Sequence, residues 1–180
     1  MRQISAIIIV SAFLLPATVA YPQRSQVPLR VFLNEIQPGV MSSPQYCLLV
    51  FDDHHFHTEK ANIKDQRATD RKVSDGQLSD KDWSALVAII DSEQFRDLNV
   101  PQSVPPSVMQ DTHPYTIGIA RGKNFQNMEF LDAKSMKPYE AEVKPLLQWW
   151  KAVRSKRMES KPSDSDSRCT LDNSHAIFAQ

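Results

Sequence analysis

The residues best suited to chemistry lie together in one polar segment, from Asp52 to Glu59. The segment runs Asp-Asp-His-His-Phe-His-Thr-Glu. Imidazole and carboxylate groups are the ligands that zinc and related metal ions prefer. If the segment is extended, His55, His57 and Glu59 share one face, because side chains alternate along a strand. One hypothesis is therefore a metal site, with or without hydrolytic activity, at the His54–His57 cluster.

A third ligand for such a site would come from Asp111 or His113. The competing interpretation is structural: the same segment is typical of a solvated hairpin tip whose Phe56 points into the core. The chain contains no HExxH or CxxC spacing, and these are the spacings that mark metal sites in a sequence. We therefore assign no metal ligand, and the metal-binding protein or metal-dependent hydrolase remains the second hypothesis.

Other catalytic patterns are absent from the sequence. No serine lies in a G-x-S-x-G turn, which would indicate a nucleophile. Only four glycines are present, and none form the glycine-rich loop that holds phosphates. The adjacent carboxylates fall at expected turns and helix N-termini, where they have a structural role. We assign no catalytic residue and no cofactor, and whether the protein is an enzyme stays open, with the sequence leaning towards no.

The elements that must position these residues follow from hydrophobic periodicity. Short apolar or alternating runs predict two hairpins, formed by 46–51 with 56–63 and by 115–121 with 125–131. Apolar residues at i, i+3, i+4 and i+7 predict two helices, one capped by Ser79 and one starting near Glu142. Pro145 is tolerated only in the first turn of the second helix.

These elements predict an α+β fold with a four-stranded, mainly antiparallel sheet in the order ββαββα and two helices on one face. Residues Leu29–Ile36 add at most a short edge strand. The other sheet face is expected to be open to solvent or to a partner. Because Trp150 is assigned to the core, we expect the adjacent Trp149 to be partly exposed, where it could anchor a partner or cover the sheet edge.

The N-terminal residues predict export. Residues 1–20 carry one charge, Arg2, then an apolar stretch and a small-residue ending at Ala20, the pattern of a signal peptide. An uncleaved anchor is the alternative. The predicted organisation is a signal peptide over 1–20, a proline-rich extended linker over 21–45, an α+β domain over 46–157 and a disordered polar tail over 158–180.

The net charge and the cysteine content limit the classes of partner that are expected. After removal of the signal peptide, 20 basic and 21 acidic residues remain, a net charge of about −1. That balance argues against nucleic acid or a charged membrane surface as a partner. A protein of the cell envelope or extracellular space remains. A bridge between Cys47 and Cys169 is chemically permitted by export, but two unpaired thiols are the preferred interpretation.

The layout resembles that of small exported bacterial proteins of hairpin–helix–hairpin–helix pattern, which have no assigned activity. The resemblance covers roughly residues 46–150. It rests on four segments of pattern: Tyr46–Glu59, the helix entry from Gly76 to Trp83, the hairpin over 115–130, and Pro145–Trp150. It implies that the Asp52–His57 region is a hairpin tip, and it transfers no functional residue. The leading expectation is an exported, non-catalytic binding domain.

Overall fold

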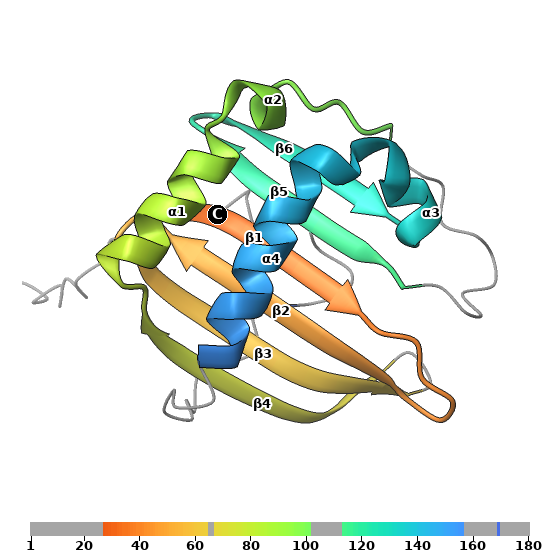
Figure 1. Cartoon of the computed structure of the whole chain (residues 1–180). Coiled ribbons are helices and arrows are strands. Elements are labelled where there is room, and N and C mark those ends of the chain that lie inside the picture. Colours follow the sequence, from red (N-terminus) through yellow and green to blue (C-terminus); the bar gives the residue numbers. More distant parts are fainter. Residues whose placement is uncertain (1–26, 65–66, 102–112, 157–168, 170–180) are drawn as a thin grey trace, which may run out of the picture.

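The computed structural model describes residues 27–64, 67–101, 113–156 and 169. Their strands form one antiparallel sheet in the spatial order β4-β3-β2-β1-β5-β6 (Figure 1). The strands are β1 (Leu29–Ile36), β2 (Ser43–Phe51), β3 (His55–Lys64), β4 (Arg67–Gln77), β5 (Tyr115–Arg121) and β6 (Asn124–Phe130). The helices are α1 (Asp80–Ile90), α2 (Glu93–Arg96), α3 (Ala133–Met136), the 3-10 helix η1 (Lys137–Tyr139) and α4 (Glu140–Lys156).

The expectation of a four-stranded ββαββα sheet is wrong, because the described sheet has six strands. The two expected hairpins exist as β2–β3 and β5–β6. The additional strands are β1 and β4. The segment 21–45, expected to be an extended linker, contains all of β1 and the start of β2. Its prolines misled the interpretation, since Pro28 and Pro38 flank β1 without entering it.

Strand β1 lies in the middle of the sheet and not at its edge. It pairs with β2 on one side and with β5 on the other. Its residues from Val31 to Glu35 are all buried, so both of its faces are covered. A strand covered on both faces shows a nearly continuous apolar run instead of alternation, and this explains why its periodicity was uninformative.

Strand β4 was left out of the predicted four-stranded sheet for the opposite reason, although Val73 and Leu78 could support a short further strand. It forms one edge of the sheet, and most of its residues are exposed or half-buried. Its sequence is dominated by charged and polar side chains. Charges and irregularities are common on edge strands, where they discourage pairing with another chain. Strand β4 fits this description, with a register shift opposite Lys60 and Asn62 and a left-handed backbone at Asp70.

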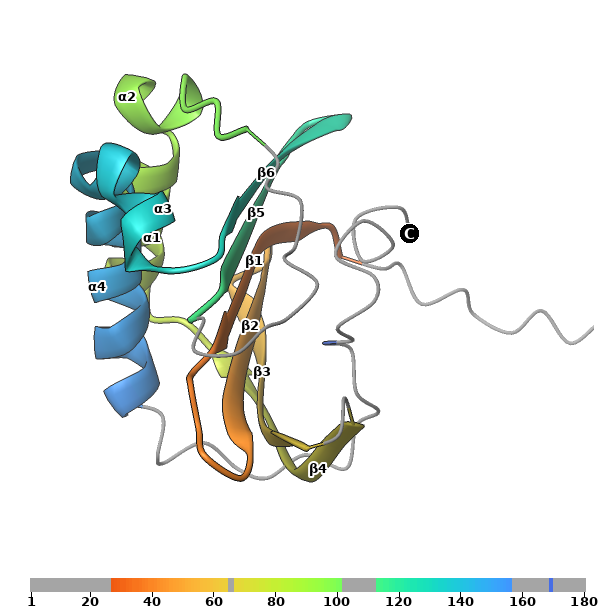
Figure 2. The same ribbon diagram turned by 90° about the vertical axis from the view of Figure 1, so that its right-hand side faces the viewer.

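Helices α1 and α4 lie on the same face of the sheet, as expected (Figure 2). They cover a core that includes Val31, Leu33, Leu48, Val50, Ile117, Ile119, Leu86, Ile90, Val143 and Leu146. Ser79 caps α1 as predicted, with its hydroxyl accepting from the Asp82 backbone N–H at 3.1 Å. Helix α4 starts at Glu140, two residues before the expected position, so Pro145 is its sixth residue and lies in the second turn.

Trp149 is buried, contrary to the expected partial exposure. Its side chain retains 8% of its accessible surface. The indole Nε1 donates to the backbone carbonyl of Asp82 at 2.9 Å, which ties α4 to the first turn of α1. Trp150, its neighbour, is also in the core. Two adjacent tryptophans can both be buried here because α4 packs against the sheet on one side and against α1 on another. Trp149 is therefore not a docking residue.

On the opposite face of the sheet, Cys169 covers the sheet around Cys47. Cys47 and Cys169 form a disulfide, with their Cα atoms 6.2 Å apart, and the expectation of two unpaired thiols is wrong. Phe32, Leu49 and the two cysteines make a second, small apolar cluster on this face. This cluster is separate from the core that α1 and α4 cover. The remaining residues of 158–180, and the expected signal peptide over 1–20, lie outside the described residues.

None of the helices formed by the described residues is long and apolar enough to cross a membrane.

Removing the disulfide should strongly destabilise the protein. The two cysteines are 122 residues apart, and a cross-link that closes so long a loop restricts the unfolded chain severely. We expect Cys169→Ala to lower the free energy of unfolding by about 2–5 kcal/mol, measured by denaturant titration. Cys47→Ala combined with Cys169→Ala should cost little more than one substitution alone. Equal stability in oxidised and fully reduced protein would contradict this assignment.

Candidate functional site

The histidine-rich segment forms the β2–β3 turn and the start of β3, and of its three suggested ligands the structure brings together His57 and Glu59 but not His55. Its turn, Asp52–His54, joins the two strands. His54 has a left-handed backbone and stacks on Trp83 of α1, with ring centroids 4.4 Å apart. Its Nδ1 lies 3.7 Å from Asp80 Oδ1. His55 is exposed. These residues fix the entry into α1 against the end of the hairpin.

His57 belongs to a buried network on the sheet face that carries the disulfide. It retains 1% of its accessible surface. Its Nδ1 lies 2.7 Å from Asp75 Oδ1 on β4, and its Nε2 lies 3.0 Å from Glu59 Oε1 on β3. Glu59 also accepts the backbone N–H of Cys169 at 2.9 Å and lies 3.3 Å from Arg71 Nε. This network therefore fastens the disulfide-bonded residue to the sheet.

The metal interpretation gains no geometric support from this arrangement. Both His57 ring nitrogens already face carboxylate oxygens. His113, one of the two suggested third ligands, contacts Glu35 instead. Asp111 lies outside the described residues. Across the part of the chain that the structure describes, no group of three or more histidine, cysteine, aspartate or glutamate side chains is placed to hold a metal ion.

A second buried carboxylate, missed by the sequence reasoning, lies on the helix-covered face. Glu35 of β1 retains 2% of its accessible surface. Four side chains donate to it or lie within hydrogen-bond distance: Arg154 Nη1 at 2.7 Å, His113 Nε2 and Tyr115 Oη at 2.9 Å, and Gln37 Nε2 at 3.2 Å. The signal was available in the sequence, since Val31, Leu33 and Glu35 alternate onto one face and the last is charged.

The electrostatics of Glu35 suit a structural role. Burial alone would raise the pKa of Glu35, but the hydrogen bonds led by the one from Arg154 outweigh it and hold the pKa below its ordinary value. Burial and then the charge of Glu35 raise the pKa of Tyr115, which keeps the phenol a donor. A general base works best with a pKa near the operating pH. Glu35 is instead an acceptor that is ionised near neutral pH and joins β1, β5 and α4.

The most exposed apolar side chains of the described residues lie at the β1–β2 hairpin tip. Val40 retains 104% of its reference exposure and Met41 retains 86%. Of the four large apolar residues exposed in the described chain, these two alone are adjacent, the others being Val27 and Phe125. We call Val40 and Met41 the apolar tip. In Figure 1 this hairpin turn extends beyond the lower right end of the sheet.

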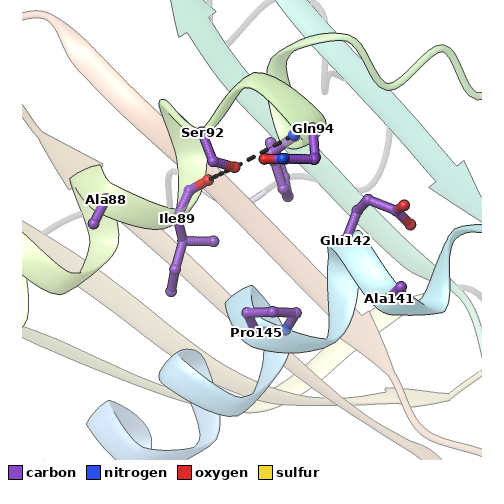
Figure 3. Close-up of a pocket in the computed structure, with 8 residues that line it drawn as sticks. Ala88, Ile89, Ser92, Gln94, Ala141, Glu142 and Pro145 are labelled. Atoms are coloured by element: carbon purple, nitrogen blue, oxygen red, sulfur yellow. Dashed lines mark hydrogen bonds between the residues drawn. The ribbon is translucent and has the colours of Figure 1, made fainter.

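A shallow groove lies between α1, α2 and the start of α4 (Figure 3), with a volume of about 390 Å³. Its lining is mainly apolar and consists of Ala88, Ile89, Ser92, Gln94, Phe95, Ala141, Glu142 and Pro145. We call this the helix groove. The sequence had singled out Pro145 only as a restriction on where the helix could start, and the groove depends on tertiary packing that periodicity does not reveal.

Comparison with models of known protein families gives no match, and comparison with curated proteins gives none either. Function is therefore argued from the residues and their geometry.

The low pKa of Glu35 predicts an acid-dependent loss of stability. A carboxyl whose folded pKa lies below its unfolded value stabilises the fold above the unfolded pKa, here near 4.5, and loses that contribution as the pH falls through the folded pKa. At pH 7 we expect Glu35→Gln to cost about 2 kcal/mol of unfolding free energy. The gap between wild type and variant should close progressively below pH about 4.5.

Denaturant titrations of both proteins across this pH range measure the gap. Glu129→Gln, on edge strand β6 and half-buried, is the matched carboxylate control. A gap that stays constant down to the acid limit would show that Glu35 does not carry the ion pair described.

Proposed function

We propose that this protein is an exported domain that acts by binding, without chemistry of its own, and that the apolar tip contacts its partner. The observation that carries the proposal is the near-complete exposure of two adjacent apolar side chains, Val40 and Met41. Isolated exposed apolar residues are common on protein surfaces, but contiguous ones indicate interaction sites.

The conformation of the tip strengthens the proposal. A Cβ built on Gly39 would overlap the Ser42 carbonyl oxygen, so this close approach needs a glycine. The base of the hairpin is closed by the Gln37 N–H donating to the Pro44 carbonyl at 2.8 Å. The backbone of the tip is thus defined by one hydrogen bond at its base and one close approach at Gly39. Binding costs less ordering entropy when the contacting residues are already held in place.

The choice of residues at the tip also favours binding. Tight turns favour Gly, Asn, Asp, Ser and Pro, each for a local conformational reason. Here the positions between Gly39 and Ser42 hold valine and methionine. Neither residue helps the turn form, and neither contributes to the described core. Local rules are broken most often at functional positions, and methionine is well suited to contacts with apolar pockets.

Two further observations support the absence of chemistry and the exported location. The groups best suited to catalysis are the buried side chains of Glu35, His57 and Glu59. Glu35 is paired with Arg154, and His57 contacts Glu59. The signal pattern over 1–20 and the Cys47–Cys169 disulfide are compatible with an oxidising compartment. The proposed partner is a protein of the cell envelope or extracellular space, and the near-neutral charge argues against nucleic acid.

Replacing the apolar tip should abolish binding and spare the fold. We expect Val40→Ser with Met41→Ser to leave the free energy of unfolding within about 0.5 kcal/mol of wild type, because exposed side chains lose no packing. A photo-reactive amino acid placed at position 41 should form a discrete cross-linked product in the native compartment. The same probe at Val27, exposed to 37% at the opposite end of β1, should not.

The double serine substitution, combined with a photo-reactive residue at position 42, should reduce the yield of that product at least tenfold. Equal cross-linking from positions 41 and 27, or unchanged yield in the double variant, would show that the tip is not the contact.

Export predicts a defined mature N-terminus. We expect protein recovered from the envelope or culture supernatant to begin at Tyr21, as measured by intact mass and N-terminal sequencing. Replacing Ala20 with a bulky residue should slow processing, since cleavage needs a small residue there. Retention of residues 1–20 in an otherwise exported protein would indicate an anchor, and recovery in the cytoplasm alone would overturn export.

A further inference from the structure

The apolar tip and the helix groove lie at opposite ends of the molecule. In Figure 1 the β1–β2 turn lies at the lower right, whereas α2 and the start of α4 lie at the top, and Figure 2 shows the same separation. We propose that the partner of the tip is a second copy of this chain, whose helix groove receives it. The inference deepens the proposed function, because it rests on the tip being a binding surface.

The tip and the groove are complementary in shape. The tip protrudes and carries two exposed apolar side chains, β-branched Val40 and unbranched Met41. The groove is concave, open and mainly apolar. Its lining includes Ile89 and Phe95 from α1 and α2 and Pro145 from α4, together with the small residues Ala88, Ser92 and Ala141. A volume of about 390 Å³ lies within the range of sites that hold compact apolar groups.

The surroundings of the tip and of the groove also differ in charge. The tip lies next to the end of the β3–β4 hairpin, because Ser43 pairs with Ile63 and Lys64 pairs with Arg67. Lys64 and Arg67 are exposed there. The groove has Glu142 in its lining, and exposed Glu93 and Glu140 are next to lining residues, against two exposed cations in the same position, Arg96 and Lys144. Two basic side chains thus lie beside the tip, and the border of the groove carries more acidic than basic side chains. Charge complementarity of this kind steers association and fixes its orientation.

A contact between two different surfaces of the same chain has a definite consequence. When one tip enters one groove the contact is heterologous, so each copy of the pair retains one unused tip or one unused groove. Association then ends when the contacts close, in a reciprocal two-fold dimer or a larger ring, or continues into an open chain of molecules. A dimer in which two tips or two grooves meet does not depend on both surfaces.

This property provides a sharp test. The tip variant is Val40→Ser with Met41→Ser, and the groove variant is Ala88→Lys, which places a charged side chain on an exposed helical position inside the groove. Wild-type protein, isolated after natural processing of its N-terminus, should show a weight-average mass that rises with concentration in analytical ultracentrifugation. Each variant alone should remain a monomer, with association weakened at least tenfold.

Mixing the two variants should restore association and stop it at a dimer. The tip variant still has an intact groove, and the groove variant still has an intact tip, so one productive contact forms and no more. The dimer population should be greatest at equal proportions. Ala85→Lys, on the exposed side of α1 one turn earlier and outside the groove lining, is the matched control and should associate like wild type.

The alternatives give different results. Wild-type protein that stays monomeric at millimolar concentration overturns self-association. If the probe at residue 41 still captures a different protein, the proposed binding function stands without self-association. If no tip-dependent cross-link forms either, both are overturned. A groove variant that associates normally, or a mixture that gives no dimer, shows that the tip enters something other than the helix groove.

Discussion

Strand β1 has to be covered on both of its faces, and the rest of the structure follows from that requirement. Val31 and Leu33 face the helices, whereas Phe32 faces the disulfide. An antiparallel sheet commonly leaves one face solvated, but a central strand with apolar residues on both sides cannot. The helix layer covers the first face. The second is closed by Cys169, which is anchored through Cys47 on the neighbouring strand β2 and through its backbone N–H to Glu59.

The two buried carboxylates show how this covering is held in position. An isolated ionised carboxylate is costly to bury, and its cost is offset only by close partners. Glu35 obtains an arginine from the last turns of α4, so the ion pair forms only when the helix is docked. Glu59 obtains a backbone donor from Cys169 and a guanidinium from Arg71 on β4. Each carboxylate therefore makes a docking contact specific, and neither is placed to react with a substrate.

The spacing of apolar residues was sufficient to predict the strands and helices with one buried side, and it failed to predict the others. The β2–β3 and β5–β6 hairpins and the capped helix α1 show the alternation or the helical spacing that local reasoning uses. Strand β1, covered twice, and strand β4, exposed at an edge, show neither. The disulfide and the burial of Trp149 depend on contacts distant in sequence, 122 residues apart in the first case. The helix groove likewise exists only after α1, α2 and α4 are packed.

The apolar tip differs from these features because its signal is local and was still overlooked. Folding does not require valine and methionine between Gly39 and Ser42, since polar residues form such turns more readily. The requirement of the fold is met by Gly39 alone, whose lack of a Cβ permits the approach of the Ser42 carbonyl. Neither Val40 nor Met41 contributes to the core clusters of the described residues, so packing within the described chain does not explain their apolar character. An exposed apolar tip suits a complementary concave apolar surface, and the helix groove is one such surface on the described part of the chain.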